Sequence, residues 1–350
     1  GNIFISSTGG DDTVSVFMRV LDVTPPEPPA GLTSDWGDGW VQLAWSPNPE
    51  EDVLRYNIYR ADEDFQGDSI GNTDGTEFLD STVTNGNLYY YAVTTVDTAE
   101  NESAFSDTVS AHPRYPQVLH VSSDGSNDGD GSAGEPFAEI QFAIDQTIMG
   151  DTVLVYPGIY TEDINFIGQE ILIASLEGQG ETTIQGTGTG SVVTFSSGET
   201  QNSILRGFTI VGGNTEQGGG IYCSGSSPRL KYLAVKGNEA DYGGGIYIEN
   251  SGVTFYRVSV TGNKGNDRGG GVYTLDSNID LLNITIAANM SDFGGGMFIK
   301  DSDIMFVNSI LWGNDEFQAA FGYVDALSHV TLYASVIQDG EDGGMGIFND

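Results

Sequence analysis

The sequence Gly-Gly-Gly-Ile-Tyr occurs at Gly218–Tyr222 and again at Gly243–Tyr247. Two close variants follow, Gly-Gly-Gly-Val-Tyr at Gly269–Tyr273 and Gly-Gly-Gly-Met-Phe at Gly294–Phe298. The four copies begin 25, 26 and 25 residues apart. A fixed period of this length is typical of a solenoid, in which each repeat forms one coil and packs only on its neighbours. The period therefore predicts stacked coils over the C-terminal part of the chain.

Apolar residues within each repeat predict how one coil is built. Two apolar pairs recur with a period of two inside each pair; Val253 and Phe255, for example, precede Val258 and Val260. Because side chains alternate between the two faces of a strand, each pair indicates a strand with one inward face. With the Gly-rich strand as the third, we expect three strands and three turns in each coil of a parallel β-helix. An asparagine column at one turn is expected to form a hydrogen-bonded ladder between coils: Asn214, Asn238, Asn263, Asn289 and Asn314.

The charge of the chain limits its partners. Its 350 residues include 50 acidic and only 12 basic side chains, which gives a formal net charge of −38. Nucleic acids and anionic membrane surfaces attract proteins through Lys and Arg, so neither is predicted as a partner. The balance favours solubility and cation binding instead. No apolar run of about 18 residues is present, so no membrane insertion is predicted.

The N-terminal segment, residues 1–23, alternates between apolar and polar residues around Gly9-Gly10-Asp11-Asp12 and predicts a β-hairpin. A lone hairpin is marginally stable in water. It is expected to pack on the next domain, to end a domain that lies upstream, or to add strands to a neighbouring molecule and so support self-association.

Residues 24–113 contain short strand-forming segments separated by turns rich in Asp, Asn, Gly and Pro, which predicts a β-sandwich. The sequences Val41-x-Leu43-x-Trp45, Tyr56-Asn-Ile-Tyr-Arg60 and Asn85-Gly-Asn-Leu-Tyr-Tyr-Tyr-Ala-Val93 resemble those of a fibronectin type III domain. The resemblance implies that Trp45 is the core tryptophan and Tyr89 the corner tyrosine. Such modules are usually spacers or binding units, so no chemistry is predicted here.

Residues 114–350 are expected to form the solenoid. An amphipathic pattern over 137–149 predicts one helix, and a helix before a stack of strands is typical of an end cap. The segments Pro136–Ile144 and Gly150–Glu162 resemble the opening of right-handed parallel β-helix proteins of the pectate-lyase-like superfamily. The combination of Gly-Gly-Gly with an aliphatic residue three before each Asn also resembles the repeats of chlamydial polymorphic membrane proteins. The predicted fold is therefore all-β: a hairpin, a fibronectin type III-like sandwich and a right-handed parallel β-helix with an N-terminal capping helix.

An acidic loop between the first strand and the helix predicts a calcium site. Its oxygen-bearing side chains occupy loop positions 1, 3, 5, 7 and 12, with Gly129 at position 6, as in a calcium-binding loop. No helix is predicted before the loop, and position 8 is Gly131 instead of an aliphatic residue. An acidic turn without a metal is the alternative. The candidate calcium ligands are Asp124, Ser126, Asp128, Asp130 and Glu135.

An aromatic column in the Gly-rich strand is a candidate surface for a glycan or protein partner. If the aliphatic residues of that strand point inward, its rings point outward, where they could stack on sugars. The alternatives are that the rings face the core or pack on one another as a structural stack. The column consists of Tyr222, Tyr247, Tyr273 and Phe298, and the period extends it to Tyr323 and Phe348.

A second column is acidic and lies two residues before each Gly-Gly-Gly sequence. Carboxylates at strand spacing repel one another unless they are solvated, protonated or bridged by a cation. The column is therefore either a cation site or a solvated turn. Its members are Glu216, Asp241, Asp267 and Asp292.

The sequence contains no complete catalytic set. Lyases of the superfamily that the solenoid resembles hold Ca²⁺ with clustered Asp and use Arg or Lys as base, and no such motif is evident. The Asp-Asp and Gly-His-Gly motifs of its polygalacturonases are also missing, and His112, His120 and His329 lie outside the middle of the solenoid. We therefore expect no catalytic residue and no organic cofactor.

Three functions remain open at this stage. The first is a secreted or cell-surface, non-catalytic module, from a prokaryote, for adhesion, glycan binding or extracellular assembly; its partner would be an extracellular polysaccharide or a protein. The second is a polysaccharide lyase or glycoside hydrolase that acts on an extracellular polysaccharide. The third is a structural subunit of an extracellular filament, joined through the N-terminal hairpin or through an uncapped last rung at Gly343–Asp350.

Overall fold

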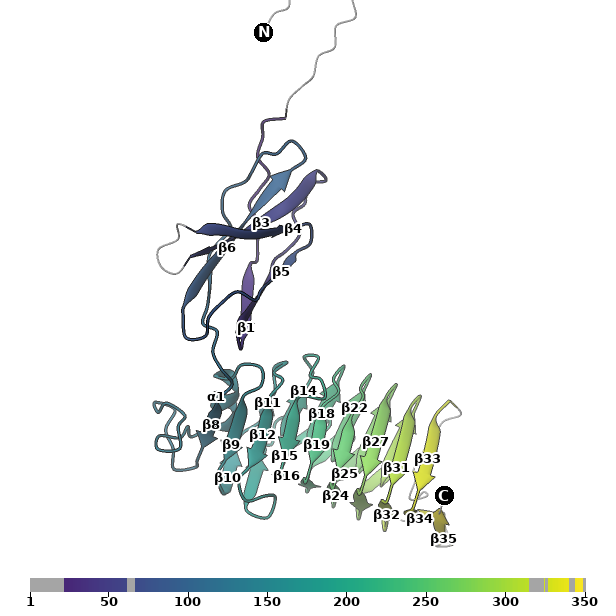
Figure 1. Ribbon diagram of the computed structural model, residues 1–350. Coiled ribbons are helices and arrows are strands. Elements are labelled where there is room, and N and C mark those ends of the chain that lie inside the picture. The colour runs from purple at the N-terminus through teal and green to yellow at the C-terminus, as the bar shows by residue number, and fades with distance from the viewer. Residues whose placement is uncertain (1–21, 62–66, 315–323, 325–326, 340–343, 349–350) are drawn as a thin grey trace, which may run out of the picture. The chain divides into compact units, whose positions relative to one another are not determined.

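The computed structural model describes residues 22–61, 67–314, 324, 327–339 and 344–348 (Figure 1). The chain divides into two compact units, Gly1–Arg114 and Tyr115–Asp350. The predicted N-terminal hairpin lies outside the described residues except for its last two positions. Both units are built from strands, with one short helix among the residues described, so the prediction of an all-β chain is confirmed.

The first unit is a sandwich of two antiparallel sheets. Its core contains Trp45, whose ring packs edge-on against that of Tyr56, as the resemblance to a fibronectin type III domain implied. The hydroxyl of Tyr89 accepts the backbone N–H of Thr84 at 3.0 Å, which fits the expected tyrosine corner. One sheet contains β1 (Thr33–Gly37), β2 (Trp40–Ala44) and β5 (Glu77–Asp80), and the other β4 (Asp68–Thr73), β3 (Val53–Ala61), β6 (Tyr89–Asp97) and β7 (Val109–Ala111).

A buried carboxylate ties the two sheets of this sandwich together. The side chain of Asp80 accepts hydrogen bonds from Arg60 at 2.6 Å, from the Tyr91 hydroxyl at 2.9 Å and from Thr82. Burial alone would raise the pKa of Asp80, but these hydrogen bonds outweigh it, and the pKa of Asp80 is lowered. The charged form is therefore the form that the folded sandwich favours.

We expect Asp80→Asn to destabilise the sandwich by about 2 kcal/mol at neutral pH, because Arg60 loses its charged partner. A lowered pKa contributes stability above the unfolded pKa of about 4, and that stability is lost as the pH falls through the folded pKa. The deficit of the variant should therefore shrink below about pH 4. Urea unfolding of the full chain by tryptophan fluorescence can report it, because three of the four tryptophans, Trp36, Trp40 and Trp45, lie in this unit. If the loss of unfolding free energy in Asp80→Asn does not change with pH, the charged form of Asp80 is not what stabilises the sandwich.

The second unit is a parallel β-solenoid in which each sheet receives one strand from successive coils (Figure 1). Sheet 1 contains β8 (Val118–Val121), β9 (Thr152–Val155), β12 (Leu172–Ser175), β15 (Ile204–Arg206), β19 (Arg229–Lys231), β23 (Thr254–Tyr256), β27 (Asn278–Leu282), β31 (Asp303–Val307) and β33 (His329–Tyr333). Sheet 2 contains β10 (Gly158–Thr161), β13 (Thr182–Gln185), β16 (Thr209–Val211), β20 (Ala234–Lys236), β24 (Ser259–Thr261), β28 (Thr285–Ala287), β32 (Ile310–Trp312), β34 (Ser335–Asp339) and β35 (Gly344–Phe348). Sheet 3 contains β11 (Ile164–Asn165), β14 (Val193–Phe195), β18 (Ile221–Ser224), β22 (Ile246–Glu249), β26 (Val272–Leu275) and β30 (Met297–Lys300).

A fourth sheet makes the prediction of three strands per coil wrong for the central coils. It lies between sheets 2 and 3 in the chain order, directly before each Gly-Gly-Gly sequence. Its residues show little apolar alternation and are mostly exposed or half-buried, so backbone hydrogen bonds between coils define it. Sheet 4 contains β17 (Asn214–Gln217), β21 (Glu239–Tyr242), β25 (Lys264–Arg268) and β29 (Met290–Phe293).

The solenoid core contains the inward aliphatic and aromatic residues that the apolar pairs predicted. Phe255, Val260 and Ile246 of one coil are fully buried, and their counterparts in the neighbouring coils are buried beside them. In sheet 3 the register pairs Ile221 with Ile246, then with Val272 and Met297, so the aliphatic residues of the Gly-rich repeat do point inward.

The asparagine ladder exists, but its first predicted member is displaced by one residue. The side chains of Asn238, Asn263, Asn289 and Asn314 are buried, and each bonds the next through an Nδ2–H to Oδ1 contact of 3.0 Å. Asn214 is exposed and pairs with Glu239 instead. Gly213 stands at the ladder position, where its N–H donates to Asn238 Oδ1 at 3.0 Å. The step of 24 residues from Asn214 to Asn238, against 25 or 26 elsewhere, reflects this displacement.

The helix predicted over 137–149 is shorter than expected, and a cap made by a helix of that length is not observed. Helix α1 spans Ile140–Asp145 and buries Ile140, Ala143 and Ile144 in the first coil. Its first N–H groups, those of Ile140 and Gln141, donate to the two carboxylate oxygens of Glu162. Burial raises the pKa of Glu162 against the opposing effect of these two donors.

The last described strand does not continue the solenoid. Strand β35 pairs antiparallel with β34, whereas the other strand pairs of the solenoid sheets are parallel in the described residues. The prediction that the parallel repeat continues to residue 350 is therefore wrong for Gly344–Phe348. Only four residues separate β34 from β35, and a parallel connection needs a dozen or more.

Candidate functional site

The aromatic column forms a continuous stack in the outward face of sheet 3. Ring centroids of Tyr222 and Tyr247 lie 5.6 Å apart, those of Tyr247 and Tyr273 5.1 Å, and those of Tyr273 and Phe298 5.0 Å. The ring planes are within 9° of parallel. The stack follows directly from the register of sheet 3, which places these residues side by side.

Neighbouring side chains cover most of this stack. Tyr247, Tyr273 and Phe298 are 3%, 6% and 5% exposed, and they form a small hydrophobic cluster separate from the main core. Tyr242 of sheet 4 packs edge-on against Tyr273, and Arg268 lies over the ring of Phe298. Burial raises the pKa of Tyr247 and of Tyr273. The prediction that these three rings offer faces to a glycan is therefore wrong, and the alternative of a self-packed structural stack describes them.

The two remaining predicted members of the aromatic column do not extend it within the described residues. Tyr323 lies outside those residues. Phe348 belongs to β35, where its backbone pairs with Ser335 of sheet 2. The prediction that Phe348 belongs to the aromatic column of sheet 3 is therefore wrong, because the chain reverses direction before Phe348.

The acidic column lies along sheet 4. Glu216, Asp241 and Asp292 are exposed and Asp267 is half-buried. A β-bulge in β25 interrupts the column, so that Asn266 donates to Asp241 at 3.3 Å, while Asp267 lies 3.8 Å from the guanidinium of Arg268. Among the residues that the structure describes, no three of these carboxylates meet within 4.8 Å. The column does not build a multidentate cation site by itself, and its role in cation binding stays a prediction.

The predicted calcium loop lies at the N-terminal edge of sheet 1. Its five candidate ligands are exposed. The loop folds back over β8: the N–H of His120 donates to the Gly131 carbonyl, and the N–H of Phe137 donates to the His120 carbonyl. The pKa of Asp130 is lowered by its hydrogen bonds from Ser132. The loop thus forms backbone hydrogen bonds with β8, the edge strand of sheet 1. Calcium binding by Asp124, Ser126, Asp128, Asp130 and Glu135 remains a prediction.

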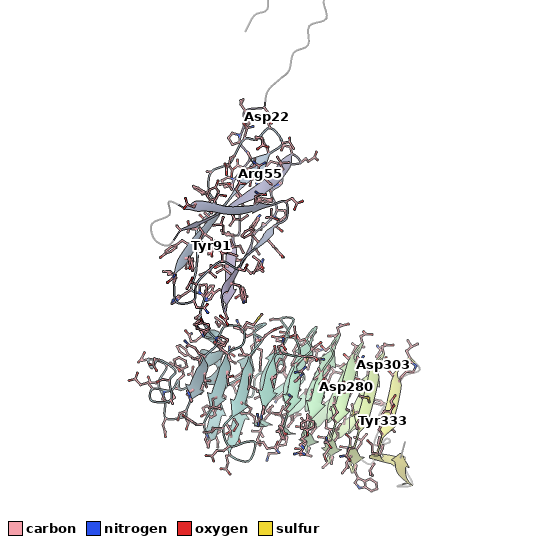
Figure 2. The ribbon with its side chains drawn as sticks, viewed as in Figure 1. Asp22, Arg55, Tyr91, Asp280, Asp303 and Tyr333 are labelled. Carbon is pink, nitrogen blue, oxygen red and sulfur yellow. The ribbon has the colours of Figure 1, made fainter. Side chains whose placement is uncertain are left out.

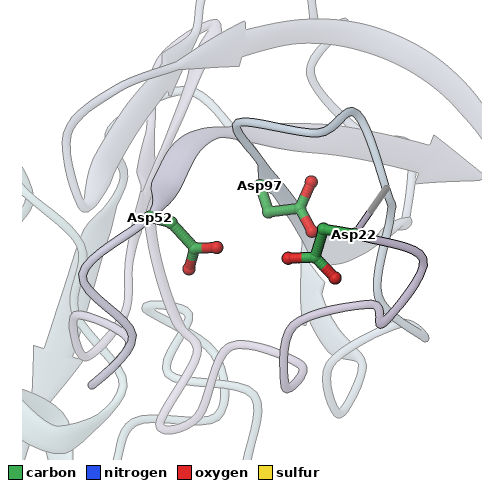
Figure 3. Close-up of side chains that lie close together, drawn as sticks. All are labelled: Asp22, Asp52 and Asp97. Atoms are coloured by element: carbon green, nitrogen blue, oxygen red, sulfur yellow. The ribbon is translucent and has the colours of Figure 1, made fainter. Parts of the chain in front are cut away.

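A different acidic group, which the sequence did not predict, lies in the sandwich. The carboxylates of Asp22, Asp52 and Asp97 lie within 4.8 Å of one another, from three separate segments (Figure 3). The Asp97 carboxylate already accepts the N–H groups of Ala99 and Asn101 and the side-chain amide of Asn101. Burial raises the pKa of Asp97, but these donors outweigh it and lower the pKa. Only tertiary structure joins residues so far apart in sequence.

A polar groove lies on the outward face of sheet 1 near its C-terminal end, where Figure 2 labels Asp303 and Tyr333. His329 Nδ1 lies 3.0 Å from Asp303 Oδ1, and their side chains are 80% and 65% exposed. Such exposure leaves both side chains in contact with water. The groove is lined by Asn278, Asp303, Ile304, Met305, His329, Thr331 and Tyr333.

The comparisons with known proteins match only short parts of the chain. No family model matches it. An amylopullulanase of Thermoanaerobacterium saccharolyticum is 38% identical over 97 residues, which is 27% of this chain and 7% of that protein. An amylopullulanase of Thermoanaerobacter thermohydrosulfuricus is 36% identical over 118 residues, which is 33% of this chain and 8% of that protein. The chain thus covers less than a tenth of these curated relatives.

Solved structures give matches of similar extent. A Fn3-like protein from Clostridium thermocellum is 25% identical, with a TM-score of 0.24, over 27% of this chain and 96% of that chain. A β-1,2-glucanase from Parabacteroides distasonis is 30% identical, with a TM-score of 0.25, over 28% of this chain and 14% of that chain. Within the described residues, no helix is long and apolar enough to cross a membrane.

Proposed function

We propose that this chain is a non-catalytic, carbohydrate-associated accessory region of a secreted bacterial protein. The observation that carries the proposal is the 38% identity over 97 residues to an amylopullulanase, a protein whose name refers to pullulan. The matched stretch is a small part of that relative, so the similarity supports an accessory role and transfers no reaction.

The geometry of the solenoid supports a role without catalysis. Glycoside hydrolysis needs two carboxyl groups in differently tuned environments on either side of a sugar bond. In the part of the chain that the structure describes, none of the repeated carboxylates of sheet 4 is buried, and the Asp303–His329 pair is open to water. Neither arrangement provides the unequal pair that this chemistry requires.

The same features support an extracellular setting. A spacer-like sandwich joined to a regular solenoid suits a chain that presents surfaces outside the cell. Calcium binding at the acidic loop, adhesion, and assembly with further copies are finer roles that this proposal leaves to experiment.

A binding and hydrolysis experiment tests the proposal. The purified chain is expected to be retained on insoluble amylopectin, pullulan or an acidic polysaccharide, and to release no reducing ends from any of them with or without Ca²⁺. A commercial pullulanase and serum albumin serve as positive and negative controls. Release of oligosaccharides would establish the enzymatic alternative, and retention on none of the glycans would refute the carbohydrate association.

A further inference from the structure

Four of the basic residues in this acidic chain gather on one surface of the solenoid. In sheet 1 the register places Arg206 beside Lys231, and Arg229 precedes Lys231 by two residues on the same outward face. Leu230, between Arg229 and Lys231, and Leu205, next to Arg206, are fully buried, which indicates that the charged residues point outward. Arg257 follows in the turn after β23, one coil further on. Only 12 basic residues occur among 350, so four of them on one surface is far more than the average composition of the chain would place there.

Two tyrosines connect these cations. The rings of Tyr232 and Tyr256 meet edge to face, with centroids 5.5 Å apart. The guanidinium of Arg206 lies 5.6 Å from the centre of the Tyr232 ring, and that of Arg257 lies 5.7 Å from Tyr232 and 5.5 Å from Tyr256. We call this surface the basic–aromatic patch; it consists of Arg206, Arg229, Lys231, Tyr232, Tyr256 and Arg257.

The cations of the patch have no carboxylate partner among the described residues. None of the ion pairs found there involves Arg206, Arg229, Lys231 or Arg257, and Arg229 donates instead to the neutral side chain of Gln201 at 3.0 Å. The two outward columns of sheet 1 carry no acidic residue from β8 to β23; the first one is Asp280, in β27. In a chain of net charge −38, such a surface keeps positive charge available to an anion.

At the patch, large side chains occupy a backbone position that favours glycine and asparagine. The turn from sheet 1 to sheet 2 holds one residue in the left-handed region in each coil from Gly207 to Ala334, with φ between 46° and 86°. Glycine and asparagine adopt this conformation most easily, and Gly207, Asn283 and Asn308 occupy it in three of the coils. Tyr232 and Arg257 occupy it in the two coils of the patch, both at φ 54°. A residue with a large side chain is strained in the left-handed region. Backbone strain that the fold does not require is typical of a functional surface.

We infer that the basic–aromatic patch binds an acidic polysaccharide, one that carries carboxylate or sulfate groups on its sugar rings. The guanidinium groups and the Lys231 ammonium bind the anionic substituents, with charge-assisted hydrogen bonds from the arginines. The rings of Tyr232, which is 36% exposed, and of Tyr256 contact the apolar faces of the sugars. Three successive coils, spaced about 4.8 Å apart, contribute these groups, so an extended chain can be held at several points. This inference rests on the proposed carbohydrate association and adds the class of glycan and the site.

Titration calorimetry of the full chain tests the site. Polygalacturonate provides carboxylate groups, dextran sulfate provides sulfate groups, amylopectin is the neutral reference, and a single-stranded oligonucleotide tests a nucleic-acid alternative. We expect binding to one or both acidic glycans that weakens as salt rises. The variants Arg206→Gln and Tyr232→Asn should each weaken it by about tenfold.

Two further measurements separate binding from folding. Tyr232→Asn places a residue suited to the left-handed region, so its melting temperature should equal or exceed that of the parent chain while its affinity falls. The matched control is Lys236→Gln, which removes one charge from exposed Lys236 in sheet 2, outside the patch, and should change affinity by less than about twofold. If Tyr232→Asn folds poorly, Arg206→Gln alone decides, because its side chain is exposed.

Each other outcome overturns the inference. Binding of amylopectin without binding of either acidic glycan would refute it and leave the carbohydrate association intact, whereas no glycan binding at all would refute both. Equal losses in Arg206→Gln and Lys236→Gln would show only a general charge effect. Tighter binding of the oligonucleotide than of either glycan would assign the patch to a different ligand.

Discussion

Replacing Gly270 by alanine is expected to prevent the central coils of the solenoid from closing. A Cβ atom at this position would lie 2.2 Å from the carbonyl oxygen of Met290 and 2.7 Å from that of Gly295. Both atoms belong to the next coil, whose backbone is hydrogen-bonded to the coil of Gly270, so neither can move away cheaply. We expect a loss of about 4 kcal/mol or more in the free energy of unfolding of the solenoid, seen as poor soluble yield and a lowered melting temperature by far-UV circular dichroism.

Gly180→Ala is the matched control for this substitution. A Cβ atom at Gly180 would meet no atom within 4 Å, and the residue is exposed in the loop before β13. This variant should keep the stability of the parent chain or gain slightly, because alanine restricts the unfolded chain more than glycine does. If Gly270→Ala melts within a few degrees of Gly180→Ala, the close approach of the Gly-rich segments is not what limits the coil.

The Gly-Gly-Gly sequences explain how much of the fold could be predicted. Their period set the coil length, and the alternation of Ile246 with Tyr247 predicted which side chains enter the core. The fourth sheet could not be predicted in the same way, because Glu239–Tyr242 forms a strand through backbone hydrogen bonds between coils. Backbone pairing leaves no apolar period in the sequence, so pattern analysis could not detect this sheet.

That missed sheet also explains the wrong prediction for the aromatic column. Alternation placed Tyr273 outside the main core, which is correct, but residues of sheet 4 such as Tyr242 then pack over it. The basic–aromatic patch shows a second limit of sequence analysis, which concerns contacts between residues of different coils. Arg206, Tyr232 and Arg257 come from three coils, and Arg206 stands in a different column from the other two, so their contacts become visible only when the coils are stacked. One sequence signal was available: Tyr and Arg occupy a turn position where three other coils have Gly or Asn and one has Ala.

Asn263→Ala is expected to produce the second large effect, through the asparagine ladder. Asn263 is 1% exposed, and its Oδ1 accepts both the backbone N–H and the side-chain amide of Asn238. Its own amide donates to the carbonyl of Val235 and to Oδ1 of Asn289, each at 3.0 Å. Truncation leaves these buried partners unsatisfied in two neighbouring coils. We expect the free energy of unfolding of the solenoid to fall by about 3 kcal/mol, since an unpaired buried polar group costs about 1–3 kcal/mol.

Hydrogen exchange of the full chain can locate this loss as well as measure it. The backbone N–H of Asn238 should lose protection first, because its acceptor is removed, and protection in the strands of the outer coils should change least. Asn214→Ala is the control: it removes the same side chain one position after Gly213, where Asn214 is exposed and outside the ladder. Similar melting temperatures for Asn263→Ala and Asn214→Ala would mean that the ladder adds little to the stability of the stack. A large difference would instead show that buried side-chain amides, together with the apolar core, hold successive coils in register.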